Sequence, residues 1–133
     1  MTRSIVIAIA FILRILRAHP DRLEAARIAS VTHGVPLRIL LSVSMVERRV
    51  GEDPTTDGVV VAWPHRGPLR EQADRAAHAI ARWHRRCGTW LRALNFYHNH
   101  FCSVRTCPPS HHHHRPYGEL VMALSLGLRG RVP

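Results

Sequence analysis

The stretch HGVPLRILLSVSMVERRVG, residues 33–51, decides the fold of this chain. Gly34 is a typical residue at the C-terminal end of a helix, and Pro36 suits the first position of the next one. We therefore expect a new helix over residues 37–50, ended by Gly51. The segment predicts two helices that meet at a tight corner.

Glu47 stands out in this helix. At about 100° per residue, Glu47 lies beside Leu40 and Val43 on the apolar side, almost opposite the polar face that carries Arg38 and Ser42. Apolar surroundings favour the protonated form of a carboxyl group. A carboxyl that keeps its proton near neutral pH can act as a general acid.

Glu47 has two possible roles, an ordinary residue at a helix end or a functional acid. Projection into solvent, or pairing with Arg48, would make it an ordinary residue at a helix end. The long segment 51–68 that follows is rich in turn pairs, and a loop of this length is usually functional. Its Asp53 and Asp57 are the nearest candidates for a second carboxylate, but their place in turn pairs favours turn formation.

The rest of the chain also predicts helices, so we expect an all-α fold with at most a very short strand pair in residues 51–68. The apolar spacing and the Gly and Pro breaks favour helices over about 5–17, 20–34, 69–87, 90–101 and 117–128, with a second loop over 102–116.

Two segments carry a family resemblance. AARIASVTHGVPLRILLSVSMVE, residues 25–47, resembles the opening of the soluble lytic transglycosylase domain of the lysozyme-like superfamily, in which a Gly-Val-Pro turn starts a helix that ends in the catalytic glutamate. ALNFYHNH, residues 93–100, is similar to the Ala-Leu-Ala-Ala-Tyr-Asn-Ala-Gly segment of that family. The resemblance covers about residues 23–128.

The resemblance implies cleavage of the β-1,4 bond between N-acetylmuramic acid and N-acetylglucosamine in peptidoglycan, by a transglycosylase or muramidase. It implies that Glu47 is the single general acid, that Tyr97 supports it, and that no cofactor is needed. The chain departs from the family at Arg48, where the family has Ser, and lacks the Gly-Leu-Met-Gln motif. An inactive module of this fold, binding peptidoglycan or serving a phage or secretion assembly, is therefore the alternative.

Further substrate contacts are expected in the loop after Glu47 and in the segment that contains Tyr97. Trp63, in the loop after Glu47, could stack on a sugar face as exposed aromatic residues do in saccharide clefts. His98 and Asn99 follow Tyr97 in the second segment and are expected to bind substrate with it.

The three cysteines are too few for a disulfide scaffold. We expect a disulfide between Cys102 and Cys107, which would place the protein in an oxidising compartment, and a buried free thiol at Cys87. The rival interpretation is a metal site that adds His98, His100 and the run at 111–114. Its spacing matches no standard zinc motif, so we expect no metal.

The charge and the N-terminal segment indicate the environment. The chain has 19 Lys and Arg against 9 Asp and Glu, a net charge of +10, which suits a polyanion such as the bacterial wall. Nucleic acid is a less favoured partner, because the arginines of the helix expected over 69–87 are explained more simply by a solvent-exposed helix face. Residues 1–20 predict a buried helix or an uncleaved export segment that could contact a membrane through residues 4–17, ahead of a transglycosylase domain over 21–133. The periplasm, the cell wall or a virion is the expected location.

Overall fold

The computed structural model describes residues 2–50, 63, 67–98 and 117–132. Within these ranges the chain is all α, with no strand, which confirms the predicted fold class. The helices are α1 (Arg3–Ala18), α2 (Pro20–His33), α3 (Leu37–Val50), α4 (Leu69–Cys87), α5 (Trp90–His98) and α6 (Tyr117–Leu128).

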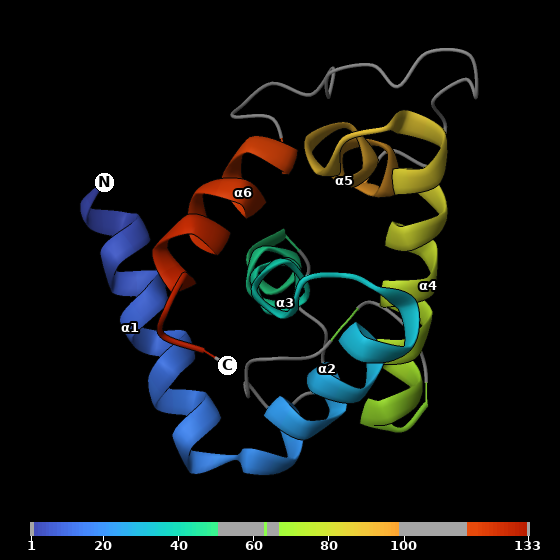
Figure 1. Ribbon diagram of the computed structural model, residues 1–133. Helices are drawn as coiled ribbons and strands as arrows, with labels where there is room; N and C mark the ends of the chain where they lie inside the picture. The colour runs from blue at the N-terminus through green and yellow to red at the C-terminus, as the bar shows by residue number, and fades with distance from the viewer. Residues whose placement is uncertain (1, 51–62, 64–66, 99–116, 133) are drawn as a thin grey trace.

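Helix α3 lies at the centre of the molecule. Figure 1 shows it end-on, with the other helices arranged around it. Every residue from 39 to 46 is buried, and eight consecutive residues cover more than two turns of a helix. Helix α3 therefore has no solvent face over this length.

The sequence predicted a polar face on α3 that carries Arg38 and Ser42, and this prediction is wrong. Ser42 is fully buried, because its hydroxyl donates to the Arg38 carbonyl at 2.7 Å and so needs no water. Ser44 is satisfied in the same way by the Leu41 carbonyl at 2.6 Å. Arg38 reaches α6, where its Nε donates to the Ser125 hydroxyl at 3.1 Å.

The corner between α2 and α3 follows the sequence pattern. Gly34 adopts a left-handed conformation with φ of 69°, which side chains rarely tolerate, and its N–H donates to the Ser30 carbonyl at 2.9 Å. The Ser30 hydroxyl donates to the Val35 carbonyl at 2.6 Å. These bonds turn the chain so that α3 can enter the core.

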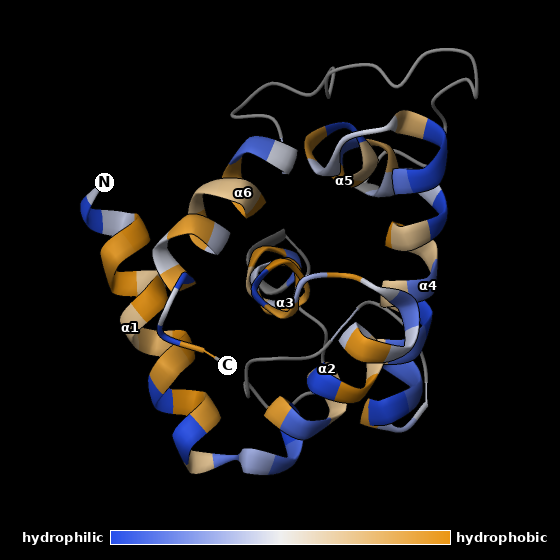
Figure 2. Cartoon of the chain, viewed as in Figure 1, coloured by the Kyte–Doolittle hydropathy of each residue, from blue (hydrophilic) through white to orange (hydrophobic). Residues whose placement is uncertain are grey.

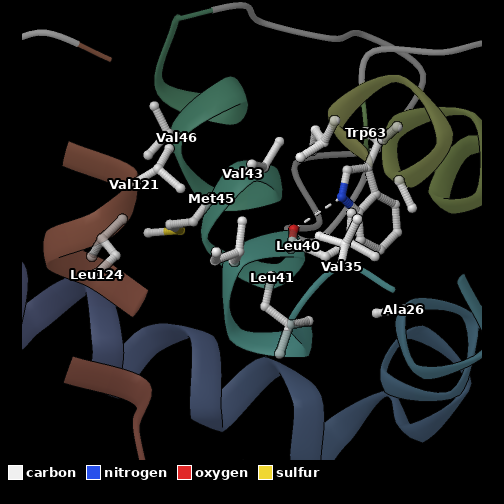
Figure 3. Packing of buried hydrophobic residues seen from close by; sticks show 14 of the residues in the cluster. Ala26, Val35, Leu40, Leu41, Val43, Met45, Val46, Trp63, Val121 and Leu124 are labelled. Carbon is white, nitrogen blue, oxygen red and sulfur yellow. Dashed lines mark hydrogen bonds between the residues drawn. The ribbon is translucent and has the colours of Figure 1, made fainter. Parts of the chain in front are cut away.

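The core surrounds α3 on all sides. Figure 3 shows Val46 and Met45 facing Val121 and Leu124 of α6, while Leu40 and Val35 face Trp63. The inner face of α1 joins the same cluster through Ile5, Ile9, Ile12 and Leu16. In the part of the chain that is described, no helix combines the length and apolar character needed to span a bilayer.

Candidate functional site

Glu47 is the first residue after the buried run of α3, and it is half-buried. Every other acidic residue in the described ranges is exposed: Asp21, Glu24, Glu71, Asp74 and Glu119. A carboxyl group that leaves water needs hydrogen-bond partners, because its desolvation is costly. The surroundings of Glu47 therefore show what holds it in place.

Tyr117 provides a hydrogen bond to Glu47. It is the first residue of α6, its ring is buried, and its hydroxyl donates to Oε1 of Glu47 at 2.8 Å. Burial raises the pKa of Tyr117 well above its ordinary value of 10.0, and the negative charge and hydrogen bond of Glu47 raise it further. The phenol keeps its proton at neutral pH and remains a donor.

Tyr97 lies near the same carboxyl group. It is buried on α5, and its pKa is raised by burial first and by the charge of Glu47 second. The chain contains only two tyrosines, and both respond to the charge of Glu47. Three helices, α3, α5 and α6, thus bring one carboxyl and two neutral phenols together.

A close approach of α5 and α6 fixes the position of Tyr117. The N–H of Gly118 donates to Oδ1 of the buried Asn95 at 2.6 Å. A Cβ on Gly118 would lie 2.6 Å from the Leu91 carbonyl oxygen and 2.7 Å from Asn95 Oδ1. Only glycine lets the start of α6 approach α5 this closely, and the adjacent Tyr117 is positioned as a result.

Trp63 is a core residue, and the prediction that it stacks on a sugar is wrong. Its side chain is 1% exposed. The indole Nε1–H donates to the Leu40 carbonyl at 3.0 Å, as the dashed line in Figure 3 shows, and its backbone N–H donates to Oε1 of Gln72 at 3.2 Å. Because its ring faces are covered and its polar atom is satisfied inside the core, no ring surface remains for a ligand.

Several predicted residues lie outside the described part of the chain. Asn99, Asp53 and Asp57 belong to this group, as do the side chains of Arg48 and His98. Within the described ranges, no three His, Cys, Asp or Glu side chains gather closely enough to hold a metal ion.

The cysteine prediction needs correction. Cys87, at the end of α4, is disulfide-bonded, so it is not the free thiol that the sequence suggested. Cys102 and Cys107 lie outside the described residues.

Sequence reasoning missed Tyr117 and Asn95. Tyr117 has a weak signal, because it is one of two tyrosines and opens the last helix. Asn95 is a polar residue between apolar neighbours on α5, a pattern that indicates a buried hydrogen bond but does not name its partner.

No family model, curated protein or solved structure matches this chain.

Proposed function

We propose that this protein is a peptidoglycan lytic transglycosylase or muramidase that cleaves the bond between N-acetylmuramic acid and N-acetylglucosamine. The observation that carries the proposal is the half-buried Glu47, the least exposed carboxyl in the described ranges, held by a neutral phenol. The resemblance of residues 25–47 and 93–100 to transglycosylase segments supports the same reaction.

In this proposal Glu47 is the general acid. Tyr117 binds Oε1, so Oε2 is the oxygen that gives its proton to the leaving glycosidic oxygen. Glycosidases that use water or a protein nucleophile need a second carboxylate. Here the 6-hydroxyl of the muramic acid attacks its own anomeric carbon and returns its proton to Glu47. The product then carries a 1,6-anhydro ring, and one carboxyl group suffices.

The two tyrosines complete the arrangement. Their raised pKa values keep both phenols neutral, so neither adds a negative charge beside Glu47. The hydrogen bond from Tyr117 restricts the orientation of the Glu47 carboxyl group. A catalytic group that is already oriented lowers the entropic cost of reaching the transition state. The net charge of +10 would favour association with the carboxylates of wall peptides.

Clearing of purified peptidoglycan, with product masses, tests the proposal. We expect anhydro-ended fragments from the wild type and a loss of about a hundredfold or more in rate for Glu47→Gln. Glu119→Gln is the matched control, because Glu119 is an exposed acid in the same helix as Tyr117. Full activity of Glu47→Gln, or an equal loss in the control, would refute the assignment.

The second candidate is an inactive wall-binding module on the same scaffold. Arg48 in place of Ser and the missing Gly-Leu-Met-Gln motif favour it. It predicts that the wild type sediments with insoluble peptidoglycan, releases no fragments, and binds as well after Glu47→Gln. Fragment release by the wild type would exclude this candidate.

A further inference from the structure

The outer face of α1 carries apolar side chains that the fold does not cover. Val6 is 51% exposed and Ile7 is 59% exposed, and Ala10, one turn further along, is also exposed. The opposite face of the same helix is buried in the core. Figure 2 shows this hydrophobic helix at the edge of the molecule. Around residues 6–10 helix α1 is therefore apolar on both sides, although only one side is packed.

Arginines surround this apolar face. Arg3, Arg14 and Arg17 are exposed on α1, and the helix contains no acidic residue. A hollow of about 550 Å³ lies between α1 and the C-terminal turn, and its lining includes Arg14, Arg17 and Arg131 together with apolar side chains and no acid. The hollow suits an anion that has apolar groups beside it.

The arginine-rich helix α4 differs in composition. Its exposed surface also contains arginines, but Glu71 and Asp74 are exposed among them, and it has no large exposed apolar side chain. Such a mixed surface is typical of a solvated helix face. Of the two helices, only α1 combines exposed apolar side chains with arginines and no acidic residue.

We propose that the outer face of α1 docks on the surface of a bilayer that contains anionic lipids. A helix of 16 residues is about 24 Å long and would lie in the plane of the interface. Val6 and Ile7 enter the boundary between headgroups and acyl chains, and Arg14, Arg17 and Arg131 hold lipid phosphates. This docking does not depend on the proposed wall-cleaving activity.

Charge complementarity favours an anionic lipid surface over a second copy of the chain. A second copy of the chain would bring the same arginines against one another, because a twofold contact pairs identical patches. Anionic headgroups neutralise the arginines instead, and each basic residue near such a surface contributes about fivefold in affinity. The apolar side chains supply the part of the binding that salt does not screen.

Vesicle flotation of the full chain tests the proposal at about 0.15 M salt. The vesicles contain phosphatidylcholine with or without phosphatidylglycerol. We expect binding to the anionic vesicles only. Combining Arg14→Gln, Arg17→Gln and Arg131→Gln should weaken it about a hundredfold, and combining Val6→Ser with Ile7→Ser should weaken it at least about tenfold.

Matched controls separate this face from the charge of the whole protein. The triple change Arg75→Gln, Arg82→Gln and Arg85→Gln removes equal charge from α4, and Val31→Ser changes a side chain that is 81% exposed on α2. Both controls should bind within about twofold of the wild type. Circular dichroism should show every variant folded, since the altered side chains are exposed.

Three results would overturn the proposal. One is equal binding to vesicles of phosphatidylcholine alone. Another is an equal loss of binding in the α4 triple variant, which would assign binding to net charge. The third is a dimer in solution that the Val6→Ser and Ile7→Ser variant dissociates, which would assign the face to a second copy.

Discussion

Replacing Tyr117 with phenylalanine removes one hydroxyl group and keeps the buried ring. The change deletes the 2.8 Å hydrogen bond to Oε1 of Glu47. An intramolecular hydrogen bond contributes about 0.5–1.5 kcal/mol net to stability. Glu47 is only half-buried, so water can replace part of this bond. We therefore expect Tyr117→Phe to lower the free energy of unfolding by about 1 kcal/mol.

A double-mutant cycle isolates this bond from other effects of the substitution. Glu47→Leu keeps similar volume but removes the acceptor, so in that background Tyr117→Phe should cost little. The difference between the two costs is the coupling energy, expected at about 1 kcal/mol.

Urea denaturation at neutral pH of the wild type, both single variants and the double variant gives the four free energies. Ser4→Ala, at an exposed position of α1, is a control that should be additive with Tyr117→Phe. A coupling below about 0.3 kcal/mol, the usual limit of additivity, would mean that Tyr117 does not hold Glu47.

Three further predictions follow from the same structure. Gly118→Ala should destabilise the protein by about 1–3 kcal/mol through overpacking against α5; an unchanged melting temperature by calorimetry would contradict this. The pKa values of Tyr97 and Tyr117 are raised in the folded protein, so folding favours the neutral phenols. Their contribution to the free energy of unfolding is complete below pH 10.0 and is lost as the pH rises above it. Stability should then fall by up to about 1.4 kcal/mol per pH unit for each tyrosine, and near-ultraviolet titration showing two normal phenols in the folded protein would contradict this. Cys87→Ser should lower the free energy of unfolding by about 2–4 kcal/mol and remove its sensitivity to reductant, and thiol titration of the denatured wild type should find one free cysteine, whereas three would contradict the bond.

The helix bounds around the site could be predicted because local residues set them. Gly34 and Pro36 define the corner before α3, and the structure places that helix at Leu37–Val50, as the sequence predicted. The burial of Ser42 could not be predicted in the same way. A helical wheel assumes that polar residues seek water, whereas a serine hydroxyl can bond to a carbonyl of its own helix and enter the core.

The candidate site was predicted only in part, because tertiary contacts complete it. The position of Glu47 on the apolar side of α3 was visible in the helical periodicity. Tyr117 lies 70 residues away in sequence, and no local pattern links the two. Trp63 stands among turn residues, which suggested exposure, yet a carbonyl of α3 accepts its indole N–H. The partner of a buried polar group depends on how distant elements pack, and the sequence of one segment does not contain that information.

The Glu47–Tyr117 bond also fixes when the site can form during folding. Its two residues enclose 69 others, including all of α4 and α5, so the site can assemble only after the chain has closed a long loop. A ribosome-bound chain that ends before residue 117 already contains Glu47 but not the helix that orients it. Emergence of α6 from the ribosome is thus the earliest moment at which the complete arrangement exists.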